Sequence, residues 1–283
     1  MKDNEIDDTT APLIEHLAEL RTRLIYSVLA FTVAMVLCFV VARPIFNFLA
    51  QPLAKLLVEH GQEPDLIFTG LQQGFMVQIK ISMFGGFVAA FPIIAYQLWR
   101  FVAPGLYRQE KRAFLPFLIA SPALFVLGAA FAYYVILPLA FDFFLSFQQM
   151  GPESFEAGDE VGIQFLGTIN EYLGLTMKFI IAFGLCFQLP VLLTLMAKAD
   201  LVTAKGLGDV RKYAIVGILT LAAIVTPPDV VTQVILFSVV YGLYEISIVL
   251  VRMVDRRREA ELRAQGLWDE GEPAAEGAGE DGA

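Results

Sequence analysis

The amino-acid sequence predicts an all-α polytopic membrane protein with six transmembrane helices, of which the fifth and sixth are short. Hydrophobic residues make up 57% of the 283 residues and charged residues only 17%, whereas a typical soluble domain carries about 25% charged residues. Long apolar runs recur along the chain and are separated by polar or turn-forming segments. The positive charges gather in alternate connections, which is typical of a chain that crosses a bilayer repeatedly.

Each span is predicted from an apolar run bounded by charged or turn-forming residues. An amphipathic helix that begins at Pro12 precedes the first span and is expected to lie on the membrane surface. The fifth run has about 14 apolar residues, which cover about 21 Å of a hydrocarbon core about 30 Å thick. Glu245 interrupts the sixth run. The predicted spans cover residues 24–42, 75–99, 113–137, 170–197, 213–226 and 230–251.

The two ends of the chain differ in composition from the rest and suggest three parts. Residues 1–23 form a cytoplasmic amphipathic segment, residues 24–251 the six-helix transmembrane domain, and residues 252–283 a cytoplasmic tail expected to be disordered. Fourteen of the 29 acidic residues lie in residues 1–23 and 259–283, so the net charge of −9 describes the ends. It is no guide to a binding surface, and nothing in the composition suggests a nucleic-acid partner.

The distribution of positive charges predicts the orientation. Sixteen of the 20 Lys and Arg residues lie in the N-terminal segment, the connections 99–112 and 198–212, and the C-terminal tail. The connections on the opposite side contain two, Arg43 and Lys55. By the positive-inside rule, both termini are expected to be cytoplasmic.

The sequence contains no motif that predicts an enzyme, a metal site or a cofactor. It lacks His-Glu-x-x-His, Gly-x-Ser-x-Gly, a phosphate-binding loop and Cys-x-x-Cys. Its two histidines are predicted to lie on opposite sides of the membrane, and its two cysteines lie inside apolar runs. Ionisable groups within spans are costly and therefore more informative. Glu245 is the deepest of them and is expected to face the helix bundle or a wet cavity.

Two carboxylates near the cytoplasmic surface have alternative interpretations. Glu110 lies among cationic residues at the start of the third span, where a Glu complements the helix dipole by about 0.3–1 kcal/mol. Glu19 lies on the amphipathic helix and is offset by Arg23 at i+4. The simpler interpretation is a solvated face with ordinary ion pairs. The alternative is an anionic site for a cationic ligand.

Six motifs follow one another along the chain. They are His16-Leu-Ala-Glu-Leu-Arg21, Gln51-Pro52, Trp99-Arg-Phe-Val-Ala-Pro-Gly-Leu-Tyr107 with Glu110, Phe131-Ala-Tyr-Tyr134 with Pro138-Leu-Ala-Phe141, Phe187-Gln-Leu-Pro190 and Thr226-Pro-Pro-Asp229. In this order they resemble the TatC family, the multispanning receptor of the twin-arginine protein translocase. The resemblance covers roughly residues 12–252, and the predicted topology between the motifs agrees with it.

The resemblance implies a receptor in the cytoplasmic (inner) membrane that binds twin-arginine signal peptides of folded precursor proteins. With small single-span subunits of the TatA and TatB types, an oligomeric complex would use the proton motive force for export. Planar guanidinium groups favour bidentate carboxylates, which is why Lys replaces Arg poorly. By resemblance, the signal-peptide-binding residues are Glu19, Arg21, Phe101, Leu106 and Glu110, and the partner-subunit contacts are Thr226 and Gln233.

The chain departs from the family pattern in the fourth span, and one other class of protein stays open. Many relatives carry a Glu where this chain has Gln188, which can form hydrogen bonds but cannot titrate. Pro52 and Asp229 match further motif positions without an assigned role. A secondary transporter of a small solute would also have six spans. It would require Glu245, Lys178 and Gln188 to converge on one closed site.

Overall fold

The computed structural model describes residues 4–102, 111–148, 165–227 and 229–264, and these are nearly all helical. The predicted all-α class is therefore confirmed. Extended structure in the described part includes an isolated bridge between Ile67 and Thr168. The helices are α1 (Asn4–Val40), α2 (Ala42–Glu59), α3 (Gln73–Val102), α4 (Lys111–Phe131), the π-helix η2 (Ala132–Ile136), α5 (Leu137–Leu145), α6 (Ile169–Cys186), α7 (Leu189–Lys198), α8 (Ala204–Asp209), α9 (Arg211–Val225) and α10 (Val230–Ala264).

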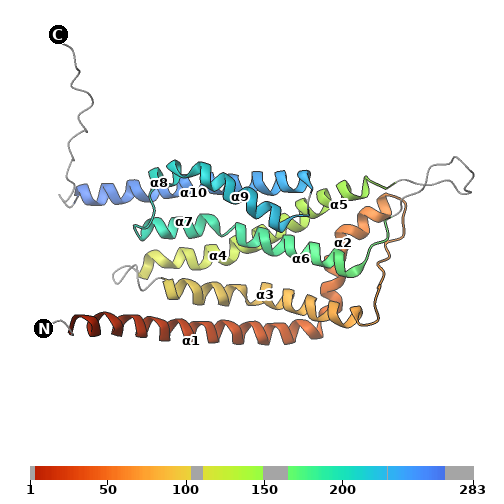
Figure 1. The fold of residues 1–283 in the computed structure, drawn as a ribbon, viewed down its shortest axis with the longest axis horizontal. Helices are drawn as coiled ribbons and strands as arrows, with labels where there is room; N and C mark the ends of the chain where they lie inside the picture. The colour runs from red at the N-terminus through yellow and green to blue at the C-terminus, as the bar shows by residue number, and fades with distance from the viewer. Residues whose placement is uncertain (1–3, 103–110, 149–164, 228, 265–283) are drawn as a thin grey trace, which may run out of the picture.

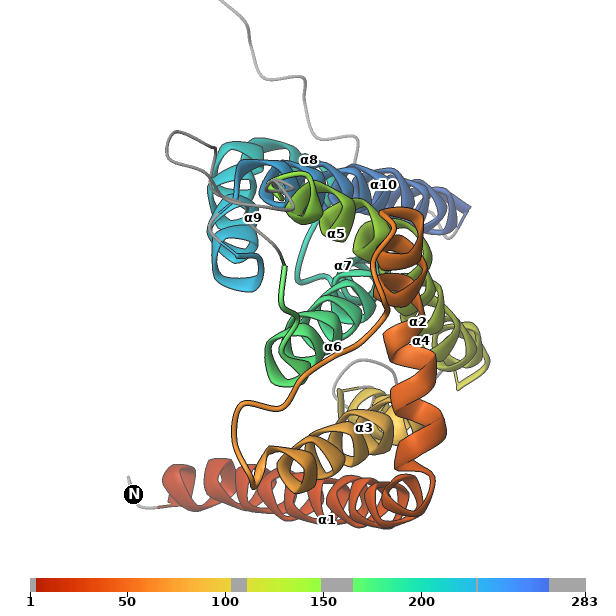
Figure 2. The ribbon, with the colours of Figure 1, turned by 90° about the vertical axis from the view of Figure 1, so that its right-hand side faces the viewer.

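Most of the helices run along one direction, as Figure 1 shows. The end-on view in Figure 2 places the α1–α3 pair at one edge and α8, α9 and α10 at the other, with α4, α6 and α7 between them. α2 crosses the end of the molecule opposite the start of α1 (Figures 1 and 2). The start of α1 and the end of α10 lie at the same end (Figure 1). This arrangement agrees with an even number of crossings.

Five helical segments in the described part are long and apolar enough to cross a membrane. They correspond to the predicted first, second, third, fourth and sixth spans. α9, the predicted fifth span, has 15 residues and is too short to be identified as a membrane span from its length. Whether α9 crosses a thinned bilayer therefore stays a prediction.

The N-terminal segment differs from its prediction. Residues 12–23 were expected to form a separate helix on the membrane surface, but α1 is one continuous helix from Asn4 to Val40 (Figure 1). No Gly or Pro lies between Pro12 and Val40, and sharp helix bends need such a cause. The amphipathic residues therefore extend the first span in a straight line.

The third span also continues beyond its predicted end. It was expected to end at Leu137 because Pro138 follows, but α5 extends the helix to Leu145. The π-helix η2 lies immediately before the proline, and the Leu137 N–H donates to the carbonyl of Ala132. This wider turn rearranges the backbone bonding where Pro138 has no N–H to donate, so the helix passes through the proline without ending.

The helix α2 (Ala42–Glu59) was not predicted from the sequence, and Pro52 lies inside it. A proline within a helix leaves the carbonyl four residues earlier without its usual donor. That carbonyl belongs to Phe48, and the Tyr133 hydroxyl of η2 donates to it at 2.6 Å. The Tyr172 hydroxyl of α6 donates to the adjacent Leu49 carbonyl at 2.5 Å. Pro52 thus leaves the Phe48 carbonyl free for Tyr133 of the third span, and Tyr172 of the fourth span binds beside it.

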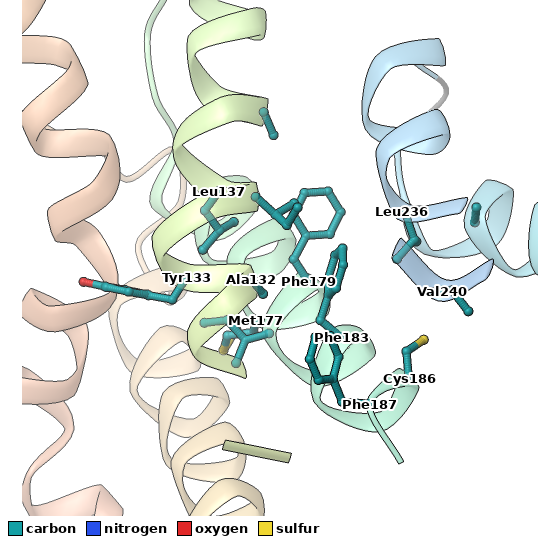
Figure 3. Packing of buried hydrophobic residues seen from close by; sticks show 14 of the residues in the cluster. Ala132, Tyr133, Leu137, Met177, Phe179, Phe183, Cys186, Phe187, Leu236 and Val240 are labelled. Carbon is teal, nitrogen blue, oxygen red and sulfur yellow. The ribbon is translucent and has the colours of Figure 1, made fainter. Parts of the chain in front are cut away.

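The hydrophobic core joins the third, fourth and sixth spans. In Figure 3, Phe179 and Phe183 of α6 stand between Leu137 of α5 and the α10 residues Leu236 and Val240. All five side chains are fully or almost fully buried. α1 lies outside this core and packs mainly along α3 (Figure 2).

The last helix passes beyond Val251, the predicted end of the sixth span, and continues to Ala264. Residues 252–264 are therefore helical, whereas the sequence analysis expected a disordered tail from residue 252. Contacts with the connection between α7 and α9 hold this extension. The Asp255 carboxylate accepts from the Ala204 N–H at 2.8 Å, and Arg258 forms an ion pair with Asp200.

Candidate functional site

The N-terminal part of α1 lies beside the C-terminal end of α3 (Figure 1), and side chains of the two helices are in contact there. The imidazole of His16 stacks on the Phe101 ring with 4.3 Å between centroids and 17° between planes. Arg23 Nη1 donates to Gln97 Oε1 at 3.3 Å. These contacts bring Phe101 to the same surface as the predicted binding residues of α1.

The Glu19 carboxylate already has a guanidinium partner. Its Oε1 accepts from Arg23 Nη2 at 2.9 Å, as the i+4 spacing predicts, and its side chain is 31% exposed. Its other oxygen, Oε2, has no hydrogen bond to any residue that the structure describes. Arg21 is exposed two residues further along the helix. Sequence reasoning paired Arg23 with Glu19 but missed Gln97, which is 74 residues from Arg23.

Leu106 and Glu110, the other two predicted binding residues, lie outside the described residues. α3 ends at Val102 and α4 begins at Lys111, and both of these helix ends lie at the same end of the molecule as the start of α1 (Figure 1).

Gln188 lies in the short break between α6 and α7, and its amide is fully engaged with Ser121 of α4. Gln188 Oε1 accepts from the Ser121 hydroxyl at 2.7 Å, and Gln188 Nε2 donates to the Ser121 carbonyl at 2.9 Å. A carboxylate could accept the first bond but has no proton for the second. The amide therefore fastens the fourth span to the third.

Glu245 was expected to face the helix bundle or a wet cavity; in the structure its side chain is 34% exposed and forms an ion pair with Arg211. Both of its carboxylate oxygens accept from Arg211 at 2.8 Å, and Oε1 also accepts from the Tyr241 hydroxyl at 2.9 Å. Arg211 begins α9 in the polar connection, and hydrogen bonding to Glu245 raises the pKa of its guanidinium. The ion pair fastens the start of α9 to α10.

The three residues that a small-solute transporter would need do not share contacts in the structure. Gln188 binds α4, Glu245 binds the start of α9, and Lys178 is exposed on α6. Among the described residues, no group of three or more His, Cys, Asp or Glu side chains could hold a metal ion. The described geometry does not support the transporter alternative.

The predicted partner contacts lie in the turn between α9 and α10, which contains Thr226, and near the start of α10, which contains Gln233. Thr226 is buried, and its hydroxyl donates to the Ala222 carbonyl at 2.9 Å. Asp229 caps α10 because its carboxylate accepts from the backbone N–H of Thr232 at 2.7 Å and from the Thr232 hydroxyl; such caps stabilise a helix start. Gln233 is half-buried, and its amide has no hydrogen bond to the part of the chain that the structure describes. Of the two predicted contacts, Gln233 has the free polar group.

Known proteins resemble this chain in sequence and in fold. A family model described as "Sec-independent protein translocase protein (TatC)" matches residues 15–238. This chain belongs to the TatC family. A TatC protein of Magnetococcus marinus is 46% identical over 259 residues, which cover 91% of this chain and 90% of that protein. A TatC protein of Aquifex aeolicus is 39% identical over 250 residues, which cover 88% and 98%.

The fold matches as well. A crystal structure described as "Twin Arginine Translocase Receptor- TatC" superposes with a TM-score of 0.70 and 38% identity, covering 84% of this chain and 98% of that chain. Membership of the TatC family makes the chain a multi-pass inner-membrane component of a protein translocase and a transport subunit without enzymatic activity. The predicted family and class are confirmed, while the roles of individual residues stay predictions.

Proposed function

We propose that this chain is the receptor subunit of a twin-arginine translocase. It binds twin-arginine signal peptides of folded precursors at the surface formed by α1, α3 and the connection 103–110. With single-span subunits of the TatA and TatB types, it exports these precursors by using the proton motive force. The observation that carries the proposal is a guanidinium, that of Arg23, held between the Glu19 carboxylate and the Gln97 amide.

Two features of this surface suit a signal peptide with paired arginines. Glu19 and Glu110 supply two carboxylates, and each can accept two parallel hydrogen bonds from a planar guanidinium. The stacked rings of His16 and Phe101 supply an aromatic surface beside them. Arg21, exposed on α1, and Leu106 complete the proposed set.

The proposed orientation places both termini and this binding surface in the cytoplasm, with six spans in all. It rests on the positive-inside rule, since 16 of the 20 Lys and Arg residues lie on one predicted side. The shared end of α1 and α10 in Figure 1 agrees with it. A precursor would then meet its receptor on the side where it is synthesised.

Binding of synthetic signal peptides to the purified full chain tests the proposal. A peptide with two consecutive arginines is expected to bind about tenfold more tightly than the same peptide with two lysines, because an ammonium cannot form a bidentate pair. Fluorescence anisotropy with both labelled peptides measures the two affinities. A peptide with scrambled order and the same net charge is the control for non-specific attraction. Equal affinity for the arginine and lysine peptides would refute the proposed recognition.

The partner contact is proposed at the α9–α10 turn. The short α9 is expected to thin the bilayer there, and a packed helix would satisfy polar groups that lipid cannot. In a variant without Cys38 and Cys186, a cysteine at Gln233 is expected to crosslink to a single-span translocase subunit. A cysteine at Thr226 is expected to crosslink much less, because that side chain is 6% exposed. Crosslinks formed on α3 or α4 but absent at residue 233 would overturn this placement.

A further inference from the structure

The guanidinium of Arg23 occupies a fork made by two acceptors from different helices. Its Nη2 donates to Glu19 Oε1 on α1 at 2.9 Å, and its Nη1 donates to Gln97 Oε1 on α3 at 3.3 Å. The Arg23 side chain is 18% exposed. The carboxylate and the amide therefore form a site that demonstrably accommodates one guanidinium, and an arginine of the protein itself fills it.

We propose that Arg23 is an internal competitor for this fork, and that an arginine of the signal peptide displaces it on binding. The inference rests on the proposed receptor function and adds a residue that sets its affinity. In the unoccupied receptor, Arg23 compensates the Glu19 carboxylate. In the bound receptor, a guanidinium of the ligand takes its place between Glu19 and Gln97.

Arg23 binds both Glu19 and Gln97, but its contacts are too weak to exclude another guanidinium from them. Its bond to Gln97 is long, and its Nε is buried without a hydrogen-bond partner among the described residues. Partly exposed ion pairs contribute little to stability because solvent screens them. A ligand guanidinium is not constrained by the i,i+4 geometry of α1, so it can meet the Glu19 carboxylate with two parallel bonds.

A displaced Arg23 guanidinium can move to the surface of α1. Its long aliphatic stem allows the charged head to reach the water or lipid headgroups beside an exposed helix surface. Leu20 and Leu24, its neighbours on α1, are themselves exposed, so an exposed surface of α1 lies next to the partly buried Arg23 side chain. The proposed exchange is a change of the Arg23 rotamer toward that surface.

Anisotropy titrations of the purified full chain with a labelled twin-arginine peptide test the displacement. Arg23→Met removes the competing guanidinium and is expected to tighten peptide binding by about two- to fivefold, the range set by a partly exposed ion pair. Arg23→Lys keeps a positive charge but lacks the planar guanidinium, and it is expected to tighten peptide binding by less than Arg23→Met does. Arg43→Met, which makes the same change in net charge on α2, is expected to leave the affinity unchanged.

A double-mutant cycle separates displacement from long-range electrostatics. In a Glu19→Gln background, Arg23→Met is expected to have no effect on affinity, because the carboxylate contested by the two guanidinium groups is gone. A residual gain there would assign the effect to charge repulsion and overturn the inference. Weaker binding by Arg23→Met in the native background would make Arg23 a positioning group instead, and unchanged binding would place it outside the site.

The outcomes also separate this inference from the receptor proposal. If the native chain binds the twin-arginine peptide and Glu19→Gln weakens that binding, the receptor proposal stands whatever Arg23→Met does. If the native chain does not bind the peptide, or Glu19→Gln has no effect, the receptor site itself is wrong.

Discussion

Replacement of Glu110 by alanine is expected to abolish export of a twin-arginine reporter while the amount of protein in the membrane stays unchanged. Loss of a hydrogen bond to a charged group costs about 1.5–3 kcal/mol, which weakens binding by about 10- to 150-fold. The change also leaves Arg108, Lys111 and Arg112 without a nearby carboxylate in the sequence. Their uncompensated positive charge would repel a ligand that carries two arginines.

Export of the reporter in cells and immunoblotting of membranes check this expectation together. Asp209→Ala is the matched control, since it removes an exposed carboxylate from α8, in a connection with the same predicted orientation. Its export is expected to be normal. Normal export by the Glu110→Ala variant would exclude Glu110 from the binding site, and a loss of protein from the membrane would indicate a structural role instead.

Gly128→Ala is expected to lower the unfolding temperature of the purified protein markedly. A Cβ at residue 128 of α4 would lie 2.6 Å from the carbonyl oxygen of Phe183 and 2.8 Å from the Phe187 ring. A backbone oxygen cannot rotate away like a side chain, so α4 and α6 would have to separate. Overpacking of this kind costs about 1–3 kcal/mol. Glycine at such a position lets two membrane helices approach closely.

Gly174→Ala is the control, because a Cβ at Gly174 meets nothing within 4 Å, although Gly174 lies in α6, the helix that Gly128 contacts. Alanine is about 1 kcal/mol more favourable than glycine inside a helix, so this variant is expected to unfold at the same or a higher temperature. Thermal unfolding of both variants in detergent, followed by circular dichroism, measures the difference. Equal unfolding temperatures would show that the close approach at Gly128 is not needed for stability.

The sequence by itself determined the class of the protein, the family and most of the spans. The length of an apolar run is a local property that does not depend on what the helix packs against. The order of the motifs in the sequence was enough to indicate the TatC family. Local reasoning failed where a neighbouring element changes what a residue can do. Pro138 was expected to end a helix, but the π turn before it let the helix continue to Leu145.

Only the tertiary structure decided which polar groups have partners. Gln188 was expected to form hydrogen bonds, but only the structure identified Ser121 as the partner of both its amide oxygen and its amide nitrogen. Glu245 was expected to face the helix bundle or a wet cavity, and only the structure identified Arg211, 34 residues away, as its partner. Arg23 and Gln97 are 74 residues apart. A hydrogen bond depends on distances of about 3 Å between atoms, and the sequence pattern specifies such distances within one helix but not between helices.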